Sequence, residues 1–230
     1  MDLNEFLVEM AKIKNGGYVR SHRTGDTGIG KTLEDLLHIQ ENNIVGPDFG
    51  NYELKSARSD SSSMLTLFTK APLPSGANGR LLETFGYPDN APKIDRELHV
   101  TVESSKVNSV GLKLVVERNK VIVGNGKGVD AYYTEDYLRE AFTQKYSHPL
   151  VYVLAERQRR EGAEWFWFNE AQLLSGFDFQ NFLDAVSRGV VKLDLRMGHF
   201  EDGRPHDHGT GFRVLPRDLP MCFANIRKLI

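Results

Sequence analysis

The sequence predicts an α/β fold in which a central mixed β-sheet is flanked by helices. Three observations lead to this prediction. A nearly continuous apolar run at 149–156 is typical of a central strand covered on both faces. Residues 98–104 and 112–117 alternate between apolar and polar side chains, as strands with one buried face do. Segments such as 32–39 carry leucines at helical spacing, which places helices beside the strands.

The pattern of apolar and polar residues predicts helices and strands along the whole chain. The helices are expected at 3–13, 32–39, 134–146, 177–188 and 217–229, and the strands at 52–57, 64–70, 98–104, 112–117, 149–156 and 190–197. Glycine, proline, serine and asparagine gather at 72–92, which predicts long connecting loops there. Gly189 is a plausible stop for the helix before it.

Composition sets wider limits. The 230 residues fit one large domain or two small ones, and 40% hydrophobic with 26% charged residues is ordinary for a globular protein. The net charge of −2 exerts no overall pull toward nucleic acid. The single cysteine, Cys222, excludes an internal disulfide framework and a cysteine-rich zinc site. We find neither a signal peptide nor an apolar run that could span a membrane, so we expect a cytoplasmic protein.

The stretch GDTGIGKT, Gly25 to Thr32, matches the phosphate-binding pattern of nucleotide-binding loops. That pattern works when a buried strand leads into the loop and a helix follows it. A helix after Lys31 fits, but residues 16–23 are mostly polar where a buried strand would be apolar. The best candidate for the metal-holding strand, 190–194, continues into further strand. The motif therefore favours a flexible loop before a helix over a nucleotide site.

Candidate catalytic residues follow the second helix. Asp48 precedes Glu53 and Lys55, which share one face of a strand while Leu54 turns into the core. Two carboxylates and the Leu54 carbonyl form a hard oxygen site suited to Mg²⁺, with Lys55 beside a metal-bound water. Glu34, on the preceding helix, could complete this site. The alternative is a surface strand whose charged residues are merely solvated.

Residues 190–213 look suited to reading base pairs. Asp194 and Arg196 share a strand face, where an aspartate could accept from cytosine and an arginine could hold guanine. The following loop offers four more polar side chains: His206, Asp207, His208 and Arg213. A zinc site on the two histidines is the alternative, although a third soft ligand is missing nearby. A second basic run, Arg157 to Arg160, reads as a solvated turn or as a non-specific phosphate contact.

Five blocks of the sequence together resemble the MvaI/BcnI family of type II restriction endonucleases, members of the PD-(D/E)xK superfamily and relatives of the mismatch-repair protein MutH. The blocks are GDTGIGKTLEDLL, PDFGNYELKSAR, LTLFTKAP, LDLRMG and HDHGTGFRV, in the family's order. The resemblance implies a PD-(D/E)xK, MutH-like fold. It also implies metal ligation by Asp48 and Glu53, a catalytic role for Lys55 and a supporting role for Glu34.

The same resemblance implies which other residues meet DNA. The loop with Lys31 lies beside the duplex, Thr69 and Lys70 belong to a DNA-facing block, and Arg213 reads a guanine with the histidines near base edges or phosphates. One unit over 1–230 is expected to form two lobes around the DNA, a catalytic part at about 1–100 and a recognition part at about 150–230. A monomer is implied, with a cognate DNA methyltransferase as its functional counterpart in a prokaryotic cell.

The expected target is CCWGG, where W is A or T. Family members that prefer a central G·C pair carry histidines at the positions of Thr69 and Gly211, and this chain has neither. Three alternatives to a Mg²⁺-dependent restriction endonuclease remain. They are a MutH-like nicking protein directed by repair partners, a DNA-binding module that does not cut, and a nucleotide-binding protein.

Overall fold

The computed structural model describes residues 1–39, 48–88, 96–124, 130–146, 148–199 and 204–230. The chain divides into two compact units, each assembled from separated stretches. Unit 1 comprises Met1–Ser63, Ser147–Phe177 and Phe223–Ile230, and unit 2 comprises Met64–Tyr146 and Asp178–Cys222. The expected division of labour between residues 1–100 and 150–230 stays a prediction. No helix in the described ranges has the length and apolar character that a membrane crossing needs.

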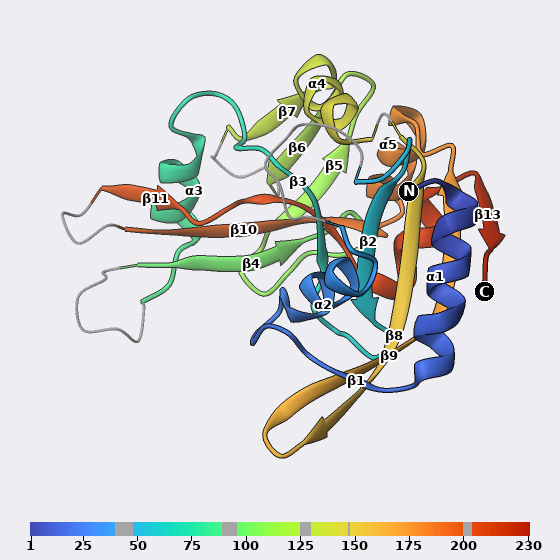
Figure 1. The fold of residues 1–230 in the computed structure, drawn as a ribbon. Coiled ribbons are helices and arrows are strands. Elements are labelled where there is room, and N and C mark those ends of the chain that lie inside the picture. Colours follow the sequence, from blue (N-terminus) through green and yellow to red (C-terminus); the bar gives the residue numbers. More distant parts are fainter. Residues whose placement is uncertain (40–47, 89–95, 125–129, 147, 200–203) are drawn as a thin grey trace. The chain divides into compact units, whose positions relative to one another are not determined.

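Unit 1 is a mixed sheet with two helices (Figure 1). The strand order is β1-β9-β8-β2, with β13 also pairing with β9. Strands β2 and β8 are parallel, and the other pairs are antiparallel. The elements are α1 (Leu3–Gly16), β1 (Val19–Arg20), α2 (Gly28–Leu36), β2 (Glu53–Arg58), β8 (Leu150–Arg160), β9 (Ala163–Ser175) and β13 (Asn225–Lys228).

The core of unit 1 joins both helices to one face of this sheet. Phe6 of α1 and Leu33 of α2 are buried with Val151 and Val153 of β8, and Leu54 of β2 packs against the same cluster. Helix α1 begins after Asp2, whose carboxylate accepts hydrogen bonds from two backbone N–H groups in a capping box. The side of β2 that carries Leu54 is therefore the side covered by helices.

Strands β8 and β9 form a long hairpin joined by Glu161 and Gly162 (Figure 1). Both turn residues have positive φ, 50° and 77°, as a type I′ turn requires. The predicted strand at 149–156 is confirmed as a central strand, since β8 has β9 on one side and β2 on the other. Its partner β9 is missing from the sequence-based prediction because its aromatic and polar residues hide the alternation.

Unit 2 contains two antiparallel sheets and three α-helices in its described part. The larger sheet has the order β11-β10-β12-β3, with β4 pairing with the other edge of β10, and the smaller has the order β5-β6-β7. Its elements are β3 (Leu65–Thr69), α3 (Ala77–Phe85), β4 (Leu98–Val102), β5 (Lys113–Val116), β6 (Lys120–Gly124), β7 (Tyr132–Thr134), α4 (Glu135–Lys145), α5 (Phe179–Ser187), β10 (Val191–His199), β11 (Pro205–Asp207), β12 (Gly211–Val214) and the 3-10 helix η1 (Pro216–Cys222).

Aromatic side chains hold unit 2 together. Phe68 of β3 and Phe212 of β12 are 5.3 Å apart between ring centroids, and Phe182 of α5 lies 5.3 Å and 5.2 Å from them. All three rings are buried. Offset or edge-on pairs of this kind contribute about 0.5–1.5 kcal/mol each beyond the area they bury. This cluster fixes β3 against β12, the two strands that bring Thr69 to Gly211.

The mixed α/β fold expected from the sequence is confirmed, but several local predictions fail besides the missing β9. The run Arg157 to Arg160, read as a solvated turn, is the end of strand β8. The predicted helix at 217–229 is wrong, because the segment forms η1 and then the edge strand β13. Pro220 lies inside η1, and proline cannot donate the hydrogen bond that an α-helix needs. The predicted long loops at 72–92 contain helix α3, while residues 89–95 lie outside the described part. Gly189 does end α5, with φ of 72°.

Candidate active site and nucleic-acid interface

The candidate catalytic residues lie together at the start of β2. Asp48 Oδ2 accepts a hydrogen bond of 2.7 Å from the Leu54 backbone N–H. Lys55 Nζ lies 3.4 Å from Glu53 Oε1. The side chains of Lys55 and Glu53 are 27% and 33% exposed, so both are open to an ion or a phosphate from solvent.

A tight turn brings Asp48 back to β2. Phe49 and Tyr52 exchange backbone hydrogen bonds of 3.2 and 2.8 Å, and Gly50 has the positive φ, 52°, that the turn requires. Phe49 is buried and stacks on Phe6 of α1 at 5.2 Å between ring centroids. Packing of the turn on α1 therefore fixes the distance between Asp48 and the strand.

The donor set suits a magnesium ion. Glu53 and Lys55 lie on the strand face opposite Leu54, whose side chain packs into the core as expected. Asp48 Oδ1 has no hydrogen-bond partner among the described residues, so one oxygen remains for a cation. In the part of the chain that the structure describes, no group of three or more His, Cys, Asp or Glu side chains is arranged to hold a metal ion. Two carboxylates supplemented by a carbonyl and waters are the usual environment of Mg²⁺ rather than of zinc.

Glu34 lies on α2 beside β2. A side chain built at Gly30 would come within 3.9 Å of Glu34 Oε1 and 4.0 Å of Ser56 Oγ. Ser56 shares the helix-covered side of β2 with Leu54. The Glu34 carboxylate thus lies on the helix-covered side of β2, opposite to the face that carries Glu53 and Lys55, and its expected part in the metal site stays a prediction.

The GDTGIGKT segment lacks the surroundings of a nucleotide loop. The strand before it, β1, has only two residues and pairs antiparallel at the sheet edge. Thr32 is buried, and its hydroxyl donates to Gly28 O at 2.7 Å and accepts from His22 N at 2.9 Å. Lys31 Nζ pairs with Asp35 Oδ1 at 2.8 Å. Hydrogen bonds from Lys31 and His22 lower the pKa of Asp35. The threonine and lysine of the motif thus have structural partners.

In unit 2, Asp194 holds two arginines. The carboxylate is 1% exposed, and Oδ2 accepts from Arg196 Nε at 2.7 Å while Oδ1 accepts from Thr101 Oγ1 at 3.1 Å. Arg213 Nε lies 3.2 Å from Oδ2, a close charge contact without the angle of a hydrogen bond. The sequence predicts that Asp194 touches cytosine. Its burial and its protein partners favour positioning of Arg196 and Arg213 instead.

The polar loop at 204–213 divides into structural and exposed residues. Asp207 Oδ1 accepts from the backbone N–H groups of Gly209 and Thr210 at 2.9 and 2.6 Å, and Oδ2 accepts from Asn78 Nδ2 at 2.8 Å. These bonds favour a role for Asp207 in shaping the loop over the direct DNA contact that the sequence predicts. The rings of His206 and His208 lie 4.2 Å apart.

The two positions used to infer the central base pair meet in the structure. Thr69 on β3 and Gly211 on β12 are direct cross-strand partners. Lys70, the next residue, is directed to α4, where its Nζ lies 3.9 Å from the Tyr137 ring centroid and 3.8 Å from Glu140. Lys70 therefore has local partners that a DNA contact would have to replace.

The sequence-based analysis missed His99 on β4. His99 is the cross-strand partner of Arg196, and its ring lies 6.0 Å from that of His208. His99 Nδ1 is also 3.4 Å from Glu97 Oε2. The only signal in the sequence is a histidine in a period-two strand, which does not reveal that β4 pairs with β10.

Comparisons with known proteins give consistent results. The model of the MvaI/BcnI restriction endonuclease family matches residues 7–223. The chain is similar to a solved complex of restriction endonuclease MvaI with its cognate DNA substrate, with 28% sequence identity, a TM-score of 0.79 and 100% of both chains covered. It is also similar to MvaI in the absence of DNA, with 28% identity, a TM-score of 0.62, and coverage of 100% of this chain and 99% of that one. The search of curated proteins gave no match.

Proposed function

We propose that this chain, which belongs to the MvaI/BcnI restriction endonuclease family, is a Mg²⁺-dependent type II enzyme that cuts double-stranded DNA at CCWGG. The observation that carries the proposal is the arrangement of Asp48, Glu53 and Lys55 at the start of β2 in a chain that the family model matches almost throughout.

The catalytic roles follow from the chemistry of each group. Asp48, Glu53 and the Leu54 carbonyl would hold Mg²⁺. When bound, this ion makes a water more acidic and neutralises charge on a phosphate. Lys55 presents an ammonium on the same face as Glu53, where it can orient the attacking water and donate to a phosphate oxygen as negative charge grows. Glu34 supports the site from α2.

Sequence reading is assigned to unit 2. Arg196 and Arg213 would each hold a guanine through the O6 and N7 acceptors of its major-groove edge. Asp194 aligns both guanidinium groups through contacts of 2.7 and 3.2 Å. Fixing an arginine before DNA arrives lowers the entropy lost on binding. His99 of β4, His206 of β11 and His208, which follows β11, lie close to one another and can add contacts to base edges or phosphates.

The preference for the central base pair is inferred from the two residues that face each other across β3 and β12. Because Thr69 lies opposite Gly211, neither of these two positions offers an imidazole to a central G·C pair, so A·T is accepted in either orientation. We further propose a monomer that cuts one strand and then the other, protected in its cell by a cognate methyltransferase. Lys31 contributes a DNA contact near the α2 loop.

Digestion of plasmid DNA tests the function directly. We expect cleavage with Mg²⁺, none with a chelator present, and product ends that all map to CCWGG on sequencing. A plasmid lacking the site is the matched control. Relaxed circles without linear product would instead indicate a MutH-like nicking activity, and intact plasmid under all conditions would contradict the proposal.

A further inference from the structure

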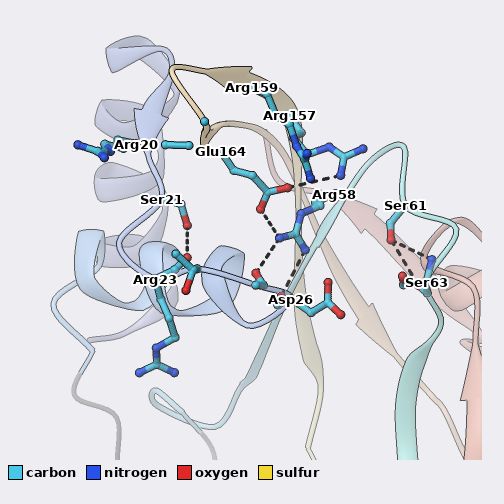
Figure 2. Close-up of a pocket in the computed structure, with 14 residues that line it drawn as sticks. Arg20, Ser21, Arg23, Asp26, Arg58, Ser61, Ser63, Arg157, Arg159 and Glu164 are labelled. Atoms are coloured by element: carbon cyan, nitrogen blue, oxygen red, sulfur yellow. Dashed lines mark hydrogen bonds and ion pairs between the residues drawn. The ribbon is translucent and has the colours of Figure 1, made fainter. Parts of the chain in front are cut away.

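A cavity of about 350 Å³ lies in unit 1, at the end of β2 away from Glu53 (Figure 2). The turn of the β8–β9 hairpin, β1 and the loop before α2 all contribute to its wall. The arginines of its lining are Arg20, Arg23, Arg58, Arg157 and Arg159. Glu164 and Asp26 are the acidic residues that line it, so arginines exceed carboxylates by three among the lining residues.

The innermost arginine, Arg58, builds the floor of this arginine cavity. Arg58 is nine-tenths buried, and its Nη2 donates to Glu164 Oε2 at 2.6 Å and to Gly25 O at 3.1 Å. Figure 2 shows its guanidinium between Glu164 and the backbone of Asp26. Burial raises the pKa of Glu164, but the charges and hydrogen bonds of Arg58 and Arg157 together hold it below its usual value. The Glu164 carboxylate therefore forms ion pairs with both Arg58 and Arg157.

The outer arginines present charge to solvent. Arg159 is exposed and forms no ion pair with any residue that the structure describes. Arg20 also borders the cavity, but it is the cross-strand partner of Trp165, so its side chain lies on the sheet face that carries Arg160. Arg159 is followed by Arg160, which points to the other face of the hairpin and stacks on Tyr18 and Trp165 at 5.1 Å. Alternation along β8 thus assigns Arg157 and Arg159 to the cavity and Arg160 away from it.

The side chains that line the cavity indicate the chemical class of its ligand. Serine and threonine hydroxyls accompany the arginines, and the lining contains no aromatic ring on which a base could stack. Arginine and hydroxyl groups are the side chains that hold phosphate oxygens of a nucleic-acid backbone, whereas recognition of a base requires stacking or edge contacts. The cavity is therefore chemically suited to a phosphodiester group.

We propose that the arginine cavity binds a backbone phosphate of the DNA duplex outside the base pairs that the enzyme reads. This inference rests on the proposed function, since it concerns the same duplex. Strand β2 sets the distance. Arg58 follows Glu53 by five residues, which is about 17 Å of extended chain, or about five base pairs of duplex. Measured outward from a cut inside CCWGG, this distance reaches beyond the five-base-pair site, so we assign the contact to flanking DNA, where it adds affinity without sequence preference.

Duplex length separates this contact from the catalytic site. Binding is measured for wild type, Arg159→Gln and the control Arg160→Gln, which has the same charge change on the opposite hairpin face. Two CCWGG duplexes are used with Ca²⁺ in place of Mg²⁺, one ending about two base pairs beyond the site and one extending about ten base pairs on both sides. Each variant is also tested for linearisation of plasmid DNA. On the long duplex, ethylation of single phosphates shows at which positions a modified phosphate blocks binding.

We expect Arg159→Gln to weaken binding of the long duplex but not of the short one. The affinity of wild type decreases as salt rises from about 50 to about 200 mM. Each lost phosphate contact should make this decrease about 3.5-fold smaller. A flanking phosphate whose ethylation blocks wild type should no longer matter to Arg159→Gln. Equal effects on both duplexes, or equal effects of Arg160→Gln, would overturn the inference. Affinity for inorganic phosphate without any dependence on flanking length would also overturn it, because the cavity would then hold a free anion. Failure of wild type to cut any plasmid would instead refute the proposed function.

Discussion

Thr69 and Gly211 lie directly opposite each other in the antiparallel pair of β3 and β12. A Cβ atom at Gly211 would lie 2.5 Å from Phe68 O and 3.0 Å from Thr69 Cα. Both neighbours are backbone atoms, so a side chain at 211 would have to push the two strands apart. Thr69 is exposed and has room for a larger side chain. The two positions therefore differ sharply in what they can accept.

This difference gives a prediction about the central base pair. Wild type should cut CCWGG and leave CCSGG, where S is C or G, intact. Thr69→His should fold with an unchanged melting temperature, while Gly211→His should lower the free energy of unfolding by about 1–3 kcal/mol through overpacking. Thermal unfolding and digestion of matched oligonucleotides measure both effects. Cleavage of CCSGG by wild type at the CCWGG rate would contradict the assignment of the centre.

Removing a carboxylate should separate cutting from binding. Glu53→Ala and Asp48→Ala are expected to abolish cleavage, whereas DNA binding survives or strengthens because a negative charge near phosphate is gone. Asp48→Asn keeps an acceptor for the Leu54 N–H but loses the charge, so it should keep the turn and still fail to cut. Glu9→Ala, which removes a partly exposed carboxylate on α1 that pairs with Lys12, is the control. Wild-type linearisation by Glu53→Ala would refute the catalytic assignment.

The arginine pair should determine discrimination between bases. Arg196→Ala and Arg213→Ala are each expected to cost about 1–3 kcal/mol at a guanine, with little change in non-specific affinity. Asp194→Asn should weaken discrimination at both guanines, because one carboxylate aligns both side chains. Competition binding with singly substituted duplexes measures these effects. A uniform loss of affinity for all sequences would identify the mutated arginine as a phosphate contact.

His208 gives a prediction about pH. Burial, and then the neighbouring His206 and His99, lower its pKa below the ordinary histidine value, while Asp207 opposes the shift. A lowered pKa in the folded state means that His208 contributes stability above the unfolded value of about 6.5, and that this contribution is lost as the pH falls toward its folded pKa. NMR titration should place its midpoint below that of a histidine in an unfolded peptide. His206→Gln should raise the midpoint and His38→Gln should not, and an unshifted midpoint in wild type would contradict the assignment.

Two glycines of the GDTGIGKT segment should respond in opposite directions. A Cβ at Gly28 would lie 2.3 Å from Arg23 O, so Gly28→Ala should destabilise the protein by about 1–3 kcal/mol. Gly30 has no foreign atom closer than 3.9 Å and lies within α2, so Gly30→Ala should stabilise by about 0.5–1 kcal/mol. Denaturant unfolding measures both changes. Calorimetry should detect no binding of Mg-ATP, and tight binding would restore the nucleotide-loop interpretation.

The sequence by itself determined the fold class, most element positions and the residues at the start of β2. Periodicity is a local property, so the apolar run at 149–156 identified a central strand, and the i, i+2 spacing placed Glu53 and Lys55 on one face. The same spacing put Asp194 beside Arg196. Family-like motifs extended this local information to function.

Tertiary structure decided everything that depends on which strands are neighbours. Asp194 is buried because β4 and β12 cover it from both sides, and Thr101 and Arg213 reach its carboxylate from those strands. Likewise, the arginine cavity joins β1, the end of β2 and the β8–β9 hairpin, which are up to 100 or more residues apart in the chain. Register and pairing are set by packing energies summed over the whole sheet, and no short stretch of sequence contains that sum.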